Sequence, residues 1–344
     1  MGNKKKVLIA LSGGVDSSIA AKLLIDQGYE LTGVYMKLHD REDNHAENIR
    51  KVAKVAEFFG FEYHVLEHQE RFGELVYQPF IETYQSGETP NPCTVCNRVM
   101  KFGALLEYAD ETGCDYLATG HYIRTDGEFF YQAEDDMKDQ SYFLFNVQKE
   151  ALGRLLFPLG NLQKSEVKAM AAKIPLLVEL ATQKESTEIC FVETDYTDVI
   201  SRHLAIDNPG EVLDTQGRRI GTHKGYMQYT IGKRRGFTVP GAKEPLYVKR
   251  IIAEKNQIVV APKEGIYESE FKVRDLNLFF TPKQKEFKAL IKVRYRNPKN
   301  PGTVILDGQG GATVRLDSPE FAIAPGQAAV FYDGDKLLGG GYIV

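Results

Sequence analysis

The sequence predicts an α/β protein in which a parallel sheet covered by helices is followed by two smaller β-rich parts. Residues 1 to about 204 alternate short apolar runs with helical periodicity, whereas helical periodicity fades after residue 205. A chain of 344 residues is also too long for one typical hydrophobic core. We therefore expect three domains with the boundaries 1–204, 205–270 and 271–344.

Strands and helices alternate in the first part of the chain. The continuous apolar runs that predict buried strands are 7–11, 31–38, 63–66 and 116–119. The segments with helical spacing of apolar residues are 19–28, 45–59 and 95–112, and the glycines at 28, 60 and 113 mark their ends. This alternation predicts a parallel sheet that binds ligands at the carboxyl ends of its strands.

The last part of the chain has the pattern of a small barrel. Short strands are expected at 275–280, 289–295, 303–306, 313–316 and 328–332, with turn dipeptides such as Asn297-Pro298 and Asp333-Gly334 between them. The segment 205–270 has the composition of a compact, glycine-rich β domain.

Composition places the chain among ordinary globular proteins, with 43% hydrophobic and 26% charged residues and a net charge of -4. No apolar run is long enough to span a membrane, and the N-terminal run stops at Leu11 without a cleavage site, so we expect a cytoplasmic protein with no membrane partner. The positive charge is concentrated. Residues 216–250 carry a net charge of +8 and residues 291–300 carry +4, which suits contact with a polyanion, although solvated basic loops would look the same.

The segment Ser12–Ser18 is the strongest single motif, because it joins the first strand to the first helix. Its two glycines permit a close approach to a ligand, and its serines and the helix N-terminus can surround a phosphate. Asp16 in such a loop is useful only if a cation or an adenylyl chemistry offsets its charge, which suggests magnesium. The sequence has neither a Walker A motif nor a dinucleotide-binding fingerprint, which disfavours kinases, GTPases and dehydrogenases.

Four cysteines in a large chain do not make a disulfide framework. Cys93 and Cys96 form a lone Cys-x-x-Cys pair, which fits a redox dithiol, half of a metal site or two packed thiols. Cys114 and Cys190, judged by their local sequence alone, fit small core residues.

The phosphate loop resembles that of the ATP pyrophosphatases, which release pyrophosphate from ATP and adenylate a carbonyl oxygen. Met36 and Gly120 end two strands at the same sheet edge and are expected to contact adenosine, with core packing as the alternative for Met36. The resemblance implies an ATP site formed by Ala10, Leu11, Ser12, Gly13, Gly14, Val15, Asp16, Ser17, Met36 and Gly120.

Further segments narrow the resemblance. They include 89–102, Ala118-Thr-Gly-His-Tyr122, Lys138-Asp-Gln-Ser-Tyr142, Phe157-Pro-Leu-Gly160, Glu188-Ile-Cys-Phe191, Gly221-Thr-His-Lys-Gly225, Tyr229-Thr-Ile-Gly232 and Arg294-Tyr-Arg296. Together they look like the tRNA-specific 2-thiouridylase family, tRNA-uridine 2-sulfurtransferases that place sulfur on C2 of the wobble uridine. That resemblance implies an adenine nucleotide alpha-hydrolase-like catalytic domain, a central β-rich domain and a C-terminal β-barrel.

The resemblance also implies a mechanism. ATP and Mg²⁺ would adenylate the C2 oxygen with the help of Asp16, and a persulfide on Cys190 would deliver sulfur. Cys96 would resolve the persulfide and leave a Cys96–Cys190 disulfide that a reductant reopens. The partners implied are the tRNA anticodon stem-loop and a sulfur donor or relay protein of a cysteine desulfurase pathway.

One position departs from the family pattern. Asn91, Pro92 and Cys93 match the residues that contact the target base, but many members carry Asp where this chain has Cys93. Cys93 therefore either occupies the base-contacting position without transferring a proton, or joins Cys96 and Cys190 as ligands of a [4Fe-4S] cluster that passes on sulfide. The sequence leaves both readings open.

The residues that match tRNA-contacting positions of the family are His121, Lys138, Asp139, Gln140, Arg294, Tyr295, Arg296 and Gln327. Arginine and lysine suit phosphates, and Tyr295 can stack on an unpaired base. The alternatives are a structural histidine at 121 and a solvent-facing barrel strand at 294–296.

Two other functions remain open from the sequence. One is a pyrophosphatase-loop synthetase that adenylates a small metabolite and needs no cysteine. The other is an RNA-binding iron–sulfur or redox protein with a vestigial nucleotide loop.

Overall fold

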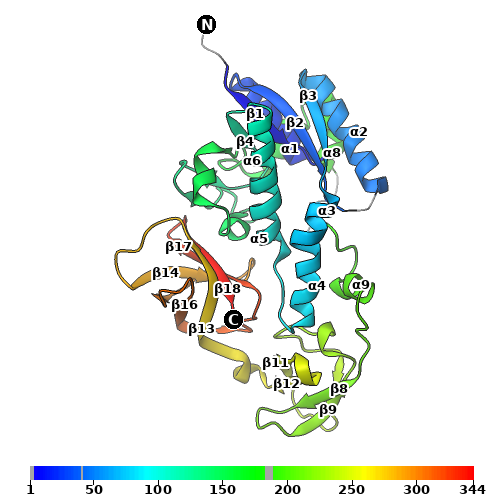
Figure 1. Cartoon of the computed structure of the whole chain (residues 1–344), viewed down its shortest axis with the longest axis vertical. Helices are drawn as coiled ribbons and strands as arrows, with labels where there is room; N and C mark the ends of the chain where they lie inside the picture. The colour runs from blue at the N-terminus through cyan, green and yellow to red at the C-terminus, as the bar shows by residue number, and fades with distance from the viewer. Residues whose placement is uncertain (1–3, 40–41, 183–188) are drawn as a thin grey trace. The chain divides into compact units, whose positions relative to one another are not determined.

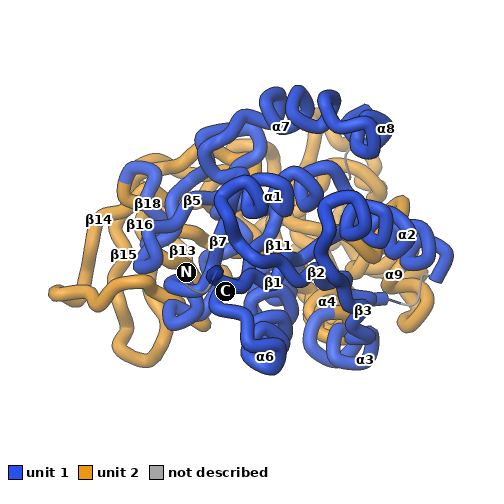
Figure 2. Tube along the Cα trace, turned by 90° about the horizontal axis from the view of Figure 1, so that it is seen from above, with its two compact units in different colours: residues 1–76, 93–187, 334–338 blue, residues 77–92, 188–333, 339–344 orange. Residues whose placement is uncertain are grey.

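The computed structural model describes residues 4–39, 42–182 and 189–344. The chain divides into two compact units, which Figure 2 shows in different colours. Unit 1 comprises residues 1–76, 93–187 and 334–338, and unit 2 comprises residues 77–92, 188–333 and 339–344. Each unit is described by itself.

The centre of unit 1 is a parallel sheet with the strand order β3-β2-β1-β4-β7. Its strands are β1 (Lys6–Ala10), β2 (Glu30–Lys37), β3 (Glu62–Glu67), β4 (Tyr116–Ala118) and β7 (Leu155–Leu156). The four predicted strands are confirmed, and β7 is additional. Because β2 and β4 lie on opposite sides of β1, the strand order reverses between β1 and β4, where open α/β sheets bind ligands.

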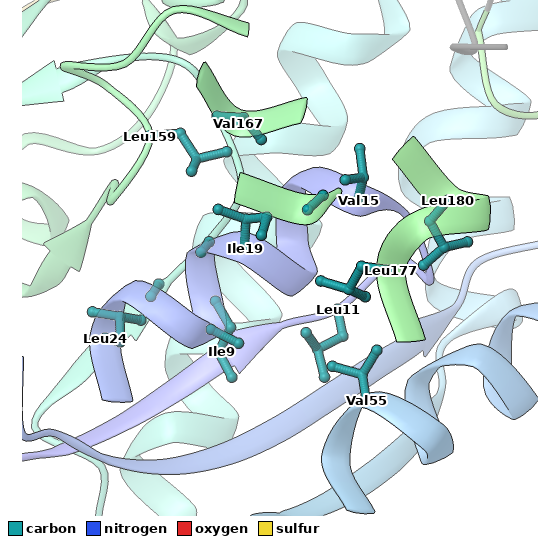
Figure 3. Packing of buried hydrophobic residues seen from close by; sticks show 14 of the residues in the cluster. Ile9, Leu11, Val15, Ile19, Leu24, Val55, Leu159, Val167, Leu177 and Leu180 are labelled. Carbon is teal, nitrogen blue, oxygen red and sulfur yellow. The ribbon is translucent and has the colours of Figure 1, made fainter. Parts of the chain in front are cut away.

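Helices cover both faces of this sheet. Figure 2 shows α1 (Val15–Asp26), α2 (Glu42–Phe59), α7 (Lys164–Ala171) and α8 (Val178–Thr182) on one side of the strands and α6 (Leu105–Glu111) on the other. Figure 3 shows the core of the first face, where Ile9 and Leu11 of the first strand segment meet Val15 and Ile19 of α1 and Val167 of α7. Burying each such side chain stabilises the fold by about 1.5–3 kcal/mol.

The predicted helix 95–112 begins earlier than expected and is not uniform. It starts as α5 (Pro92–Cys96), continues as a π-helix (Asn97–Ala104) and ends as α6. Proline is favoured at the first helical position because its missing N–H has no partner there anyway, so Pro92 starts the helix.

Unit 1 also contains several short elements. These are α3 (Gln69–Phe72), most of a π-helix (Gly73–Tyr77), β5 (Arg124–Thr125), β6 (Phe130–Tyr131) and the 3₁₀ turns Ser141–Leu144, Lys149–Arg154 and Pro175–Leu177.

Unit 2 contains a five-stranded sheet with the order β10-β9-β8-β12-β11. Its strands are β8 (Gly210–Leu213), β9 (Arg219–His223), β10 (Phe237–Thr238), β11 (Tyr247–Ile252) and β12 (Gln257–Ala261). The helices of this unit are α4 (Gln78–Gln85) and α9 (Tyr196–Ser201), with 3₁₀ turns at Tyr226–Gln228, Ala253–Lys255 and Lys263–Ile266. The predicted central β domain is confirmed.

The C-terminal strands form a closed antiparallel barrel. They are β13 (Tyr267–Leu278), β14 (Glu286–Lys292), β15 (Asn300–Leu306), β16 (Ala312–Phe321), β17 (Ala328–Asp333) and β18 (Lys336–Ile343), and pairing of β13 with β18 closes the ring (Figure 1). The sequence did not predict β18, because Gly339–Gly341 removes the side chains that signal a strand. Lys336 and Leu337, the first residues of β18, belong to unit 1 and pair there with β6.

None of the helices in the described ranges is long and apolar enough to cross a membrane.

Candidate active site

The predicted phosphate loop leaves β1 at the switch point of the sheet and enters α1. Gly13 has a φ of +78°, and a Cβ atom there would lie 3.2 Å from the backbone of Asn48, so only glycine fits without strain. The Ser17 hydroxyl accepts from Ser12 N (3.2 Å) and donates to Gly14 O (3.1 Å). No side chain caps α1 at Gly14, which leaves the first-turn N–H groups without helical partners and suited to an anion.

Gly120 follows β4 and closes the other side of this switch point. A Cβ atom on Gly120 would lie 2.9 Å from Ser17 N and 3.1 Å from Asp16 C, so the backbone at 120 touches the start of α1. Gly120 therefore lies at the sheet edge beside the loop, as expected, and its contact with adenosine stays a prediction. Met36 lies half-buried, one residue before the end of β2.

Asp16, in the first turn of α1, already has a cation. Lys164 Nζ donates to Asp16 Oδ1 (2.6 Å) and Oδ2 (2.7 Å), and the Tyr122 hydroxyl donates to Asp16 Oδ1 (2.9 Å). The Lys164 ammonium also lies 5.7 Å from the centre of the Tyr122 ring. Only 9% of the Lys164 side chain is exposed, against 34% of the Asp16 side chain.

Sequence reasoning missed Lys164 and Tyr122 as members of this site. Lys164 is 148 residues from Asp16 in the chain, so no local pattern joins them. The structure alone shows that Lys164 is the buried first residue of α7, where the helix dipole disfavours a positive charge and a compensating carboxylate is needed.

The pairing of Asp16 with Lys164 affects whether Asp16 can bind the expected magnesium ion. Both Asp16 oxygens accept hydrogen bonds from Lys164, so in this arrangement the carboxylate is not placed as a metal ligand. Within the described ranges, no group of three or more His, Cys, Asp or Glu side chains could hold a metal ion. Since Lys164 already pairs with both oxygens of Asp16, this arrangement does not present Asp16 as a Mg²⁺ ligand, and we route no step through the ion.

Cys93 and Cys96 lie on the helix that starts at Pro92. Cys93 is in its first turn and half-buried, whereas Cys96 is 7% exposed at the end of α5, directly before the π-helix. The helix predicted to begin at residue 95 begins at Pro92, so Cys96 lies at the end of α5 and not in the first turn. π-helical turns are often found at functional sites, and this one separates Cys96 from α6.

Cys190 belongs to unit 2 and is exposed. Its neighbour Phe191 is buried, with its ring centre 5.3 Å from that of Tyr77 and 5.1 Å from that of Phe80. Phe191 therefore fixes the chain next to an exposed thiol. Glu188 of the same motif lies outside the described residues. Because Cys93 and Cys96 are in unit 1, the three thiols are divided between the two units.

His121 is buried and bonded on both ring nitrogens. Nδ1 lies 2.7 Å from Thr119 Oγ1 and Nε2 lies 3.4 Å from Lys101 Nζ. Burial, with the Lys101 charge beside it, holds the pKa of His121 well below its ordinary value. A neutral ring that accepts from Lys101 and donates to Thr119 satisfies both contacts. The predicted tRNA contact of His121 stays a prediction.

The predicted RNA segment 138–140 is bonded to the neighbourhood of the phosphate loop. Gln140 Oε1 accepts from Tyr122 N (2.9 Å), and Gln140 N donates to Tyr122 O (3.0 Å). Asp139 is buried and accepts from Ser141 N and Oγ and from Ala133 N. The side chains of Asp139 and Gln140 thus shape the loop, and Lys138 is half-buried.

The predicted RNA residues of unit 2 lie in loops. Residues 294–296 follow β14, which ends at Lys292, so they are not on a barrel strand as the alternative had it. Arg294 donates to Ile231 O (3.1 Å) and Ala322 O (2.8 Å), which joins two loops of unit 2, whereas Arg296 is exposed. Tyr295 is half-buried with Lys292 Nζ 5.8 Å from its ring centre.

Gln327 lies beside the chain that leads to the predicted base-contacting residues. Its amide donates to Thr89 O (3.1 Å) and Pro90 O (3.0 Å), directly before Asn91. Asn91 is half-buried and Pro92 is buried. The structure therefore brings Gln327 and the 89–92 segment together within unit 2.

Three protein-family models match successive parts of the chain and identify the class of each domain. Residues 5–194 match the family model described as tRNA methyl transferase HUP domain. Residues 197–262 match the tRNA methyl transferase PRC-barrel domain, and residues 268–343 match the aminomethyltransferase beta-barrel domain. The predicted boundaries 1–204, 205–270 and 271–344 stay predictions.

Relatives that match along their whole length assign the family. The chain is 56% identical over 340 residues to the tRNA-specific 2-thiouridylase MnmA of Nitratiruptor sp., covering 99% of both chains. It is 53% identical to the MnmA of Sulfurimonas denitrificans and 49% identical to that of Campylobacter jejuni, covering at least 98% of each chain. The chain belongs to the tRNA-specific 2-thiouridylase family. Among solved structures, an NMN synthetase from Francisella tularensis matches with a TM-score of 0.35 and 17% identity over 53% of this chain and 66% of that one, too weak to add to this conclusion.

Proposed function

We propose that this chain is a tRNA-uridine 2-sulfurtransferase that adenylates the C2 oxygen of the wobble uridine with ATP and then replaces that oxygen by sulfur. The observation that carries the proposal is the match with 2-thiouridylases along 99% of the chain, together with a phosphate loop at the switch point of the sheet. The names of those relatives identify a tRNA uridine as the substrate and thiolation as the reaction.

The phosphate loop supports the first step. The uncapped N-terminus of α1 and the Gly13–Gly14 backbone suit the phosphates of ATP. Attack of the C2 oxygen on the α-phosphorus forms an O–P bond and releases pyrophosphate, which makes the oxygen a leaving group as part of AMP. The uridine must leave the anticodon stack to reach the loop.

The exposure of the thiols supports the second step. An exposed Cys190 is accessible to a donor protein that transfers a sulfane sulfur to it, whereas the 7% exposed Cys96 is shielded from that exchange. The terminal persulfide sulfur attacks C2 and AMP leaves with the former C2 oxygen. The Cys96 thiolate then attacks Cys190 Sγ, the S–S bond to the substrate breaks, and the electron pair stays on the C2 sulfur. A dithiol reductant reopens the Cys96–Cys190 disulfide.

Cys93 leaves a second route for the sulfur open. A [4Fe-4S] cluster would need Cys93, Cys96 and Cys190 as ligands, and the persulfide route likewise needs Cys96 to meet Cys190, which belongs to the other unit. We describe the persulfide route, and the cluster stays an alternative. Iron and sulfide analysis of anaerobically purified protein decides the point. Thiolation by iron-free protein supports the persulfide route.

Single-turnover thiolation of unmodified tRNA tests the proposal. Wild type should convert uridine to 2-thiouridine and release one pyrophosphate for each sulfur transferred. Cys190→Ala should still release pyrophosphate without thiolation, because only the second step is blocked, and Asp16→Ala should do neither. Pyrophosphate release with a small metabolite in place of tRNA would favour a different synthetase. RNA binding without pyrophosphate release would favour a redox protein.

A further inference from the structure

The strongest feature that the proposed function does not use is the buried cation beside the phosphate loop. Lys164 Nζ lies 2.6 Å and 2.7 Å from the two Asp16 oxygens, and Asp16 is the second residue of α1. The ammonium is therefore bonded to a residue in the first turn of α1, the turn whose backbone N–H groups suit an anion. A loop that carries an aspartate next to a phosphate needs a compensating positive charge, and here the protein supplies its own.

Two contacts of Lys164 and a capping box at the start of its helix hold the residue in place. Its backbone N–H donates to the buried Asp135 carboxylate (2.8 Å), and the helix it starts has a reciprocal capping box formed by Gln163 and Glu166. Its side chain is 9% exposed and bonded to Asp16, which also accepts from Tyr122. A flexible lysine is thereby ordered before any ligand arrives.

The position of Lys164 in α7 argues against a role in stabilising that helix. A cation at the first residue of α7 is repelled by the helix dipole, so this helix gains nothing from it. Exposed ion pairs of this chain, such as Lys22 with Asp26 at 2.5 Å, need no such arrangement. The Lys164 ammonium is instead paired with Asp16 of the phosphate loop.

From this geometry we infer that Lys164 is a nucleotide-binding residue that donates to the phosphates of ATP, and that Asp16 and Tyr122 are positioning residues that hold its ammonium beside the loop. The inference rests on the proposed use of ATP, and it replaces the magnesium role that the sequence suggested for Asp16. The ligand class is a nucleoside triphosphate or its pyrophosphate product.

Equilibrium titration of the full-length protein with ATP in EDTA, and again in excess Mg²⁺, tests the inference. Loss of one charge-assisted hydrogen bond should weaken binding of metal-free ATP by roughly ten- to a hundredfold in Lys164→Met. Lys164→Arg, which keeps the charge, should restore part of the affinity. Lys173→Met removes an equal charge from an exposed position of the same unit and should bind as wild type does. Thermal melting of each variant checks that it is folded.

A double variant separates phosphate contact from simple neutralisation of Asp16. Asp16→Asn with Lys164→Met removes both charges, so the loop keeps the net charge of wild type. If Lys164 donates to phosphate, metal-free ATP binding stays weak in this variant. If the double variant binds ATP as wild type does, Lys164 only neutralises Asp16 and the inference is overturned. Equal binding by Lys164→Met and wild type would overturn it too, while leaving thiolation intact. A wild type that binds no ATP with or without Mg²⁺ would instead defeat the proposed function.

Discussion

Asp16→Asn should destabilise the protein strongly, because it leaves a buried ammonium without its carboxylate. Breaking a fully buried ion pair from one side costs about 3–5 kcal/mol. The Lys164 side chain is 9% exposed, but the Asp16 side chain is 34% exposed, so water reaches the pair and reduces the penalty. We expect a loss of about 2 kcal/mol in the free energy of unfolding. For a domain of this size, that lowers Tm by roughly 4–8 °C.

The opposite substitution should cost less. Lys164→Met leaves a carboxylate that is one-third exposed and still bonded to Tyr122, so it can hydrate, and we expect a loss of about 1 kcal/mol. The double variant should recover most of the stability, because replacing both partners removes the buried charge together with its desolvation. The order of stability should be wild type and double variant above Lys164→Met, and Lys164→Met above Asp16→Asn.

The matched control is Asp26→Asn on the same helix. Asp26 pairs with Lys22 at 2.5 Å, but the two side chains are 56% and 36% exposed, so the loss should be only a few tenths of a kcal/mol. Urea unfolding of the four variants and wild type measures the differences. If Asp16→Asn loses no more stability than Asp26→Asn, the pair is solvated and the reasoning about its buried charge fails.

Three further predictions concern other parts of the candidate site. Burial keeps the folded-state pKa of His121 below its unfolded value of about 6.5, so wild type should lose roughly 1.4 kcal/mol of stability for each pH unit below about 6.5, until the folded-state pKa is reached. His121→Gln should lack that part of the acid dependence in urea titrations at pH 5.5 and 7.5, and equal slopes would contradict the assignment of a neutral ring. Arg296→Ala should reduce the salt dependence of tRNA binding by about 0.7–0.9 in log–log slope, whereas Arg294→Ala, which loses its carbonyl contacts to two loops, should lower Tm. An unchanged salt slope for Arg296→Ala would remove it from the RNA contacts. Brief iodoacetamide treatment followed by peptide mass analysis should label exposed Cys190 before buried Cys96, and the reverse order would contradict the roles given to these thiols.

Local patterns predicted the parts of the fold that depend on local sequence. Apolar runs and glycine stops placed β1 to β4 correctly, and the glycine after β4 was correctly expected at the sheet edge, because Gly120 leaves room for the backbone of Ser17. The strand β18 was missed because Gly339–Gly341 hides its pattern, and its pairing with β13 is what closes the barrel.

Contacts between residues far apart in the chain could not be predicted in this way. Asp16 meets Lys164 through the packing of α1 and α7, which no spacing rule joins, so the sequence suggested magnesium where the protein places its own ammonium. For the same reason, no local pattern predicts that the Arg294 guanidinium donates to carbonyl groups of two loops of unit 2, and its RNA contact stays a prediction.

An oxygen-18 label on the uridine C2 atom tests the central claim most directly. tRNA carrying [2-¹⁸O]uridine at the wobble position is incubated with the protein, ATP and a persulfide donor, and the AMP is analysed by mass spectrometry. Because activation joins that oxygen to the α-phosphorus, every AMP produced with a thiouridine should carry one ¹⁸O atom. Thiouridine formation with unlabelled AMP would show that the oxygen leaves by another route.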